Sequence, residues 1–367
     1  MPLRRKTAVI GTAIKVPVSG DRQSHEELLY DITQEVLRDA GLSIEDIDGI
    51  VVGSNDQFDG RAISVMAASG SVGGVDRDIL STPSAGEHAV IMGALRIASG
   101  QFETHLVLAW SPNEASSLSE AQRLGNDPYF HRILPLDEIG AAALQANVLR
   151  GKDAGYTARA EARSAQNLAA GRVSQKPSEG GEAQITPPWP LSADMAPPAI
   201  TGLVAMVLAS EDYVAAKGLT NVAWLRGMGW ATEAAFLGDR DLATAPALEE
   251  AADRAYAEAG ITTPASAFDV IELTGATPYQ ELLAQSVLKL EEPGRAAVNP
   301  SGGVSTLNPV FCTGTIRIAE AARQVMGRAG THQIAGARRA LAHASSGFAM
   351  MYQAVLVLDA DRQGTQA

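Results

Sequence analysis

The sequence predicts an α/β protein built from two similar halves with an inserted region between them, and three observations support this prediction. Residues 35–54 (EVLRDAGLSIEDIDGIVVGS) and 254–274 (RAYAEAGITTPASAFDVIELT) share one order: a helix-like stretch, a stop at Gly41 or Gly260, a polar turn and a β-branched apolar run. Strand-like and helix-like segments alternate on either side. The chain has 367 residues, 46% of them hydrophobic and 19% charged, which is enough for about two domains and a substantial core.

The first half is predicted to run strand, helix, strand, helix, strand. Glycines at 41 and 100 end the two helices, because glycine readily adopts the left-handed conformation of a helix C-terminal cap. The expected elements are a strand at 7–14, a helix at 24–40, a strand at 47–52, a helix at 85–99 that is opened by a turn at 81–84, and a strand at 104–110.

Residues 111–198 interrupt this alternation with polar helices, a QKPSEGGEAQ segment and a PPWP cluster at 187–190. Long insertions in globular proteins are usually functional, so a lid or an oligomer contact is expected here. The predicted division is therefore residues 1–110 with 199–220 as the N-terminal half, 111–198 as the insertion, and 221–367 as the C-terminal half.

The second half repeats the order of the first. After the insertion, a strand at 202–209 completes the first half. The second half is expected to contain a strand at 222–228, the second copy of the helix, glycine and strand motif, a glycine-rich turn at 299–303, a helix at 314–326 and a final strand at 350–358. Two halves with one order predict two α/β units related by a pseudo-twofold axis, which together form a layered αβαβα sandwich.

Charge and composition exclude several classes of protein. A formal net charge of −13 argues against a surface for nucleic acids or anionic membranes. The only cysteine, Cys312, excludes an intrachain disulfide and a multi-thiolate metal site, and no metal is expected. The longest apolar stretches, 203–209 and 348–358, are too short for a membrane-spanning helix. A cytoplasmic protein without an export signal is the resulting expectation.

Duplicated halves, an inserted middle, a glycine turn before a buried helix and the NPSGG segment at 299–303 resemble the thiolase superfamily. The segment DRDLATAPALEEAADRAYAEAGI, followed by DVIEL, is most similar to the sterol carrier protein X (lipid-transfer) type. The resemblance implies a dimer formed through the first half, CoA thioesters as substrates, coenzyme A entering only as part of the substrate and no separate cofactor. It also implies an active site at the helix N-termini of both halves.

The residues at the family's catalytic positions differ from those of a standard thiolase. Pro83, before Ser84 in Pro-Ser-Ala-Gly, stands where a thiolase has its nucleophilic cysteine, and proline supplies neither a nucleophile nor a backbone donor. Asn308 stands at the first histidine; its amide donates a hydrogen bond to an oxyanion but does not shuttle protons. Thr274 replaces the water-holding asparagine, and His343 of HASSG falls at the last catalytic position. Ordinary thiolysis is therefore excluded.

Four catalytic candidates follow: Tyr279, Tyr352, His343 and Asn308. In cysteine-less thiolase relatives that act as steroid side-chain retro-aldolases, tyrosines in the regions of Tyr279 and Tyr352 carry the acid–base chemistry. The alternative is that both tyrosines only pack beside strands. His343 is a candidate general base or a satisfied histidine near the final strand. Ser84, Thr274, Gly302, Gly303 and Cys312 are expected at the substrate and CoA site, with burial as a small core residue the alternative for Cys312.

Two functions remain open. The first is an enzyme that cleaves or forms carbon–carbon bonds in CoA thioesters without a cysteine nucleophile, as a retro-aldolase does. For this function the resemblance implies a zinc-ribbon/OB-fold partner protein. The second is a catalytically silent thiolase-like subunit that supports an active thiolase or acyltransferase chain in a heteromeric complex.

Overall fold

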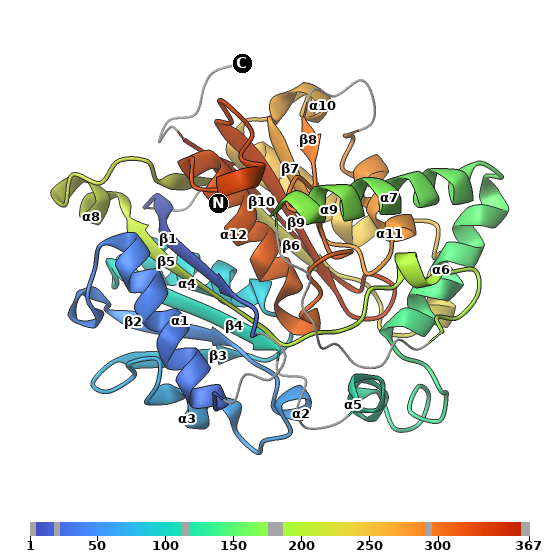
Figure 1. The fold of residues 1–367 in the computed structure, drawn as a ribbon, viewed down its shortest axis with the longest axis horizontal. Helices are drawn as coiled ribbons and strands as arrows, with labels where there is room; N and C mark the ends of the chain where they lie inside the picture. The colour runs from blue at the N-terminus through green and yellow to red at the C-terminus, as the bar shows by residue number, and fades with distance from the viewer. Residues whose placement is uncertain (1–4, 18–22, 112–116, 175–185, 291–295, 361–367) are drawn as a thin grey trace.

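The computed structural model describes residues 5–17, 23–111, 117–174, 186–290 and 296–360 (Figure 1). Its strands in the described part are β1 (Thr7–Lys15), β2 (Gly49–Gly53), β3 (Asp78–Thr82), β4 (Thr104–Ser111), β5 (Gly202–Ser210), β6 (Ala223–Thr232), β7 (Val270–Leu273), β8 (Ala297–Val298), β9 (Arg339–Ser346) and β10 (Tyr352–Asp359). The helices are α1 (His25–Ala40), α2 (Asp56–Asp59), α3 (Ser64–Ser69), α4 (Glu87–Ala98), α5 (Leu118–Gly125), α6 (Glu138–Lys152), α7 (Tyr156–Ser174), α8 (Glu211–Ala216), α9 (Pro246–Ala259), α10 (Pro264–Ala267), α11 (Pro278–Val287) and α12 (Thr313–Met326).

The strands are hydrogen-bonded in the order β3-β2-β4-β5-β1-β6-β10-β9-β7-β8. In the first five, β2 runs parallel to β3 and β4, while β5 is antiparallel to β4 and β1. In the second five, β7 runs parallel to β8 and β9, while β10 is antiparallel to β9 and β6. The second set repeats the strand arrangement of the first in reverse order. The short β1–β6 pairing joins the two sets, with Ala8 opposite Trp224 and Val9 opposite Ala223. This arrangement confirms the predicted duplication.

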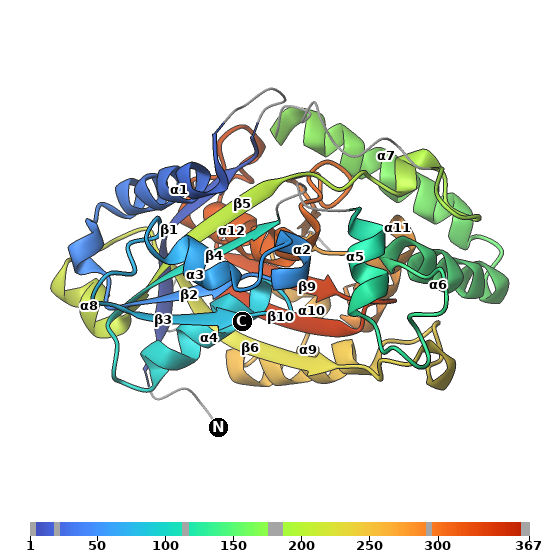
Figure 2. The same cartoon turned by 90° about the horizontal axis from the view of Figure 1, so that it is seen from below.

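Helices cover and separate the two sets of strands (Figures 1 and 2). The central helices α4 and α12 share one apolar core with strands of both halves, including Val107 and Leu356. The outer helix α1 packs with first-half strands in a second core, and α9 and α11 pack with second-half strands in a third. The layers therefore run helix, sheet, helices, sheet, helix, which confirms the predicted layered α/β class.

Glycines end equivalent helices in the two halves. Gly41 after α1 has φ 69°, and Gly260 after α9 has φ 70°, both left-handed. At the start of α1, Ser24 and Glu27 form a capping box, with the Ser24 Oγ accepting from the Glu27 amide. The repeated sequence motif thus marks the same structural element twice.

The sequence prediction missed the internal strand β9, because His343 was expected in a loop beside the final strand, and it also missed two short edge strands, β3 and β8. β3 takes up residues 78–82, including Ser81 and Thr82, which had been assigned to a turn. β8 has only two residues. Both lie at the ends of the sheet, where one neighbouring strand suffices, so neither needs the long buried apolar run that identifies a central strand.

The insertion carries α5, α6 and α7; α6 and α7 lie beside α11 of the second half in both views (Figures 1 and 2), whereas α5 lies against α2 of the first half, where Gln57 Nε2 donates to the Ala121 carbonyl at 2.8 Å. The chain then returns to the first half as β5, between β4 and β1. On α7, the Asn167 side-chain amide donates to both carboxylate oxygens of Glu281 on α11, at 3.0 and 2.8 Å. Buried polar contacts therefore fix α7 to the second half.

Candidate functional site

The two central helices begin close together, and a backbone hydrogen bond joins their starts. The amide of Gly86, which precedes α4, donates to the carbonyl of Phe311, which precedes α12, at 3.1 Å. A side chain at position 86 would not fit, since its Cβ would lie 2.8 Å from that carbonyl oxygen. Pro83 is exposed, and its carbonyl accepts from Asn55 Nδ2 at 3.0 Å. The glycine thus brings the helix starts of both halves together.

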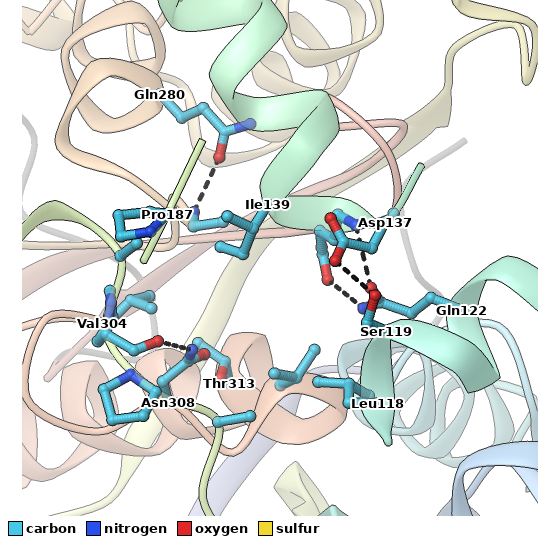
Figure 3. Close-up of a pocket in the computed structure, with 18 of the residues that line it drawn as sticks. Leu118, Ser119, Gln122, Asp137, Ile139, Pro187, Gln280, Val304, Asn308 and Thr313 are labelled. Atoms are coloured by element: carbon cyan, nitrogen blue, oxygen red, sulfur yellow. Dashed lines mark hydrogen bonds between the residues drawn. The ribbon is translucent and has the colours of Figure 1, made fainter. Parts of the chain in front are cut away.

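A cavity of about 220 Å³ lies beside the start of α12 (Figure 3). The insertion contributes residues of α5 and α6 and the segment 186–199, and the second half contributes the rest. Its apolar lining consists of Leu118, Ile139, Pro187, Pro188, Ala196, Pro197, Pro198, Ala199, Ala276, Val304, Val310 and Met350. Its polar lining consists of Ser119, Gln122, Asp137, Glu138, Thr186, Thr274, Gln280, Asn308, Thr313 and Ser345, with the backbone of Gly347.

Hydrogen-bonding groups without a protein partner line this cavity. Thr274 and Thr313 are both buried, and neither Oγ1 has a hydrogen-bond partner among the described residues. The Asn308 Nδ2 donates to the Pro197 carbonyl at 3.1 Å and keeps a second N–H (Figure 3). Because buried polar groups are nearly always satisfied, these groups are available to hydrogen-bond a molecule in the cavity, whether water or a substrate.

Glutamines hold the strand end at Thr274 in place. The Gln280 Oε1 accepts from the Ala276 amide at 2.9 Å (Figure 3), and its Nε2 donates to Gln145 Oε1 at 2.9 Å. Gln145 lies on α6 and donates in turn to the Leu242 carbonyl at 3.0 Å. This chain of amides connects the insertion to the loop after β7 and fixes the polar wall of the cavity.

Glu138, the first residue of α6, places a carboxyl group in the cavity lining. Its Oε2 accepts from Gln122 Nε2 at 2.9 Å. Burial raises the pKa of Glu138 to about 7, and the nearby carboxylates of Asp137 and Glu87 act in the same direction. A carboxyl group with this pKa exchanges protons near neutral pH, as a general acid or base must.

A second carboxyl group, Glu87, lies buried at the start of α4. Its Oε1 accepts from Ser346 Oγ at 3.3 Å, while its Oε2 has no hydrogen-bond partner among the described residues. Burial raises the pKa of Glu87 to about 7 as well. Neither glutamate was predicted from the sequence. Glu138 belongs to the insertion, whose conformation no local pattern fixes, whereas a charged residue inside the apolar 85–99 helix was the available signal for Glu87.

Of the predicted site residues, the cavity brings together Asn308 and Thr274. Tyr279 does not line it: the ring is buried, stacked at 5.7 Å on Tyr156, and its hydroxyl donates to Thr157 Oγ1 at 3.0 Å. His343 is buried within β9, where Nε2 pairs with Gln353 Oε1 at 2.8 Å and burial lowers the histidine pKa to about 4. The strand reaches the cavity only at Ser345, two residues later.

Cys312 is also outside the cavity lining. The side chain is completely buried, its Sγ approaches the Gly202 carbonyl at 3.5 Å, and burial raises the pKa of the thiol. The packing alternative for this residue therefore fits the structure, since a high thiol pKa and burial make cysteine inert.

Two further predicted residues lie together at the start of α4. The Ser84 Oγ is 2.6 Å from His88 Nδ1, and the Tyr352 ring meets the His88 ring edge-on at 5.9 Å. Neither Ser84 nor Tyr352 belongs to the described cavity lining.

The predicted glycines have a packing role in the structure. Gly302 and Gly303 have φ 96° and 60°, and a Cβ on Gly302 would lie 2.6 Å from the Cα of Gly171 on α7. They position the turn before Val304, which does line the cavity. Among the described residues, no helix is long and apolar enough to cross a membrane, and no group of three or more His, Cys, Asp or Glu side chains is arranged to hold a metal ion.

Comparisons with known proteins agree with this architecture. Residues 285–360 match the thiolase C-terminal domain-like family. Human sterol carrier protein 2 is 35% identical over 111 residues, which is 26% of this chain and 20% of that protein. The match thus spans about a fifth of the length of the curated relative.

Solved structures match over nearly the whole chain. The Ltp2-ChsH2(DUF35) aldolase has a TM-score of 0.76 at 17% identity, covering 98% of this chain and 99% of that one. A monomeric SCP2-thiolase-like protein type 1 from Mycobacterium smegmatis has a TM-score of 0.72 at 18% identity, covering 100% and 80%. At this identity the likeness shows the fold. Together with the sequence matches, it shows that this chain has a thiolase-like fold and is similar in part of its sequence to the thiolase C-terminal domain-like family and to sterol carrier protein 2.

Proposed function

We propose that this protein is a carbon–carbon lyase that cleaves a β-hydroxyacyl-CoA thioester without a covalent enzyme intermediate. One observation carries the proposal: the Glu138 carboxyl group shares a cavity with Asn308 and the unpartnered hydroxyls of Thr274 and Thr313, while the chain's only cysteine lies outside that cavity. The site supports proton transfer and oxyanion binding, and it offers no thiolate nucleophile.

In the proposed reaction, Glu138 accepts the proton of the β-hydroxyl group. The Cα–Cβ bond then breaks, leaving a carbonyl product and the enolate of a shorter acyl-CoA. The second N–H of Asn308 and the Thr274 and Thr313 hydroxyls donate hydrogen bonds to the substrate oxygens, including the enolate oxygen. Glu138 then donates this proton to Cα of the enolate, so the enzyme neither gains nor loses a proton over the reaction.

Coenzyme A enters this proposal as part of the substrate, and no separate cofactor is proposed. None of the described residues that line the cavity is Lys, Arg or His. The phosphates of coenzyme A would therefore lie outside the cavity, where water solvates them, and only the acyl group and thioester would enter.

We also propose that a partner protein acts with this chain. The aldolase with the same fold is named as an Ltp2-ChsH2 assembly, and the partner implied by the resemblance is a zinc-ribbon/OB-fold protein. Between α5 and α6, which both line the cavity, Tyr129, Phe130 and Ile133 are exposed. Exposed apolar side chains of this kind suit a protein interface. A homodimer and a cytoplasmic location are part of the same proposal.

The alternative is a catalytically silent subunit in a complex with an active thiolase-like chain. It is favoured by the burial of Tyr279 and His343 away from the cavity and by Pro83 at the family's nucleophile position. Against it stand the polar cavity wall and the pKa of Glu138, which inactive sites have no reason to retain.

The deciding experiment supplies a panel of β-hydroxyacyl-CoA thioesters, with and without a zinc-ribbon/OB-fold partner, and detects products by mass spectrometry. We expect a shorter acyl-CoA together with an aldehyde or ketone, at the same rate in the Cys312→Ala variant. Turnover that disappears in Cys312→Ala, or an acyl adduct on the protein, would refute the non-covalent mechanism. Absence of products under all conditions would favour the silent subunit.

A further inference from the structure

The buried Glu87 carboxyl group contacts two segments that line the cavity, 313–314 and 345–347, which together are called the cavity floor here. Its Oε2 is so close to Gly314 that a Cβ there would lie 2.7 Å away, and Gly314 follows the cavity-lining Thr313. Its Oε1 accepts from Ser346, which stands between two further lining residues, Ser345 and Gly347. Glu87 therefore contacts both segments that form the floor.

Glu138, which lines the cavity, contacts the same 345–347 segment. The Gly347 backbone amide donates a hydrogen bond to its carboxylate, and the charge of Glu87 acts on it. Ser346, which ends β9, and Gly347, which begins the following turn, thus each hydrogen-bond one of the two carboxyl groups. Each glutamate is also the first residue of its helix, so that α4 and α6 point their N-termini toward this turn.

Few other charges reach the two glutamates. The negative charge of Asp137 raises the pKa of Glu138, and the negative charge of Glu87 raises the pKa of the Cys312 thiol. Among the described residues, no Lys, Arg or His forms an ion pair with either glutamate. When two neighbouring carboxyl groups lack a countercation, ionisation of one opposes ionisation of the other.

We propose that Glu87 is a positioning residue whose ionisation is coupled electrostatically to that of Glu138, with the 345–347 segment between them, so that the two form one coupled carboxyl pair. The unpartnered Glu87 Oε2 supports this, because a buried carboxyl oxygen with no donor is far less costly when the group is protonated. The use of the pair in catalysis rests on the proposed function, whereas the pairing itself does not. In that use, Glu87 would set the protonation state of Glu138 and take no direct part in bond cleavage.

The test is a pH titration of the substrate-free protein labelled with ¹³C at the glutamate carboxyl carbons and followed by NMR. Glu87→Gln should lower the apparent pKa of Glu138 by about 1 unit, and Glu138→Gln should do the same for Glu87. Glu120→Gln, an exposed carboxyl on α5, is the matched control and should change neither value. Since Glu138 is only half-buried, its variant tests the coupling even if Glu87→Gln fails to fold.

An apparent pKa of the remaining glutamate that is the same in a variant and in the wild type would overturn the proposal. The titration needs no turnover, so it distinguishes failure of the pairing from failure of the proposed function. If the protein is active, Glu87→Gln should also shift the acidic limb of the pH–rate profile, which a purely structural change would leave in place.

Discussion

Arg317 on α12 and Glu272 on β7 form an ion pair of 3.1 Å with both side chains completely excluded from solvent. Ser301 completes the cluster, since its hydroxyl donates to Glu272 Oε2 at 2.7 Å and its amide donates to Oε1 at 3.2 Å. The pair therefore joins a central helix, a strand and the glycine turn that precedes the cavity-lining Val304. Glu272 therefore has a structural role.

Breaking this ion pair should strongly destabilise the protein. Arg317→Met leaves Glu272 as an unpaired buried group, for which a loss of about 3–5 kcal/mol in the free energy of unfolding is typical. The double variant Glu272→Leu with Arg317→Met removes both charges and should recover much of that loss. Urea unfolding measures both. A double variant as unstable as the single one would show that the charge pairing is not what the fold depends on.

Replacing Glu87 should change how stability depends on pH. The folded-state pKa of Glu87 is raised to about 7 from its ordinary 4.5, so its protonated form is the one that the fold tolerates. The wild type should therefore lose stability as the pH rises from 4.5 through 7, by up to about 3 kcal/mol, and the loss should level off above that. Glu138 and Glu281, whose pKa values burial also raises to about 7, add to the loss over the same range. Glu87→Gln should therefore lose less stability than the wild type, while Glu120→Gln should retain the full loss.

Thermal or urea unfolding at pH 5 and pH 8 makes this comparison directly. Glu87→Gln is expected to gain relative to the wild type only at the higher pH. An equal difference at both values would mean that the substitution changes packing and not ionisation.

Local signals in the sequence were sufficient for most of the fold. Gly41 and Gly260 marked equivalent helix ends because the left-handed cap requires glycine, and that requirement does not depend on distant contacts. Most of the buried strands were identified from continuous apolar runs, but β9 was not, because its polar HASSG end is typical of a loop. β8 was not, because two residues carry no periodicity, and Ser81 and Thr82 resembled a turn because an edge strand is only half-buried.

The site was less predictable, because it is formed by contacts between segments that lie far apart in the sequence. Motif position placed Asn308 and Thr274 correctly at the cavity. The Tyr279 hydroxyl instead donates a hydrogen bond to Thr157 on α7. This helix belongs to the insertion, whose conformation no local sequence pattern determines. Glu138 enters the cavity from the same insertion and was missed for the same reason.

Cys312 should be unreactive in the folded protein. It is completely buried, and burial raises the pKa of its thiol, so little thiolate is present near neutral pH. A disulfide exchange reagent should detect essentially no thiol in the native protein and one thiol after unfolding, since the chain has a single cysteine. Rapid modification of the native protein, or acylation of Cys312 by an acyl-CoA, would contradict the assignment of this residue to the core.

The final prediction decides between carboxylates and tyrosines as the groups that transfer protons. Glu138→Gln keeps the shape of the side chain but removes its basicity, so it should lower turnover by roughly 10² to 10⁴-fold. Tyr279→Phe should instead leave turnover near the wild-type value and cost about 0.5–1.5 kcal/mol of stability, because it removes only the hydrogen bond to Thr157. Tyr352→Phe should behave similarly, as its ring contact with His88 is retained. Steady-state rates and unfolding curves measured on the same preparations separate these effects. A large loss of turnover in either phenylalanine variant, with Glu138→Gln near wild type, would return the acid–base role to the tyrosines that the resemblance suggested.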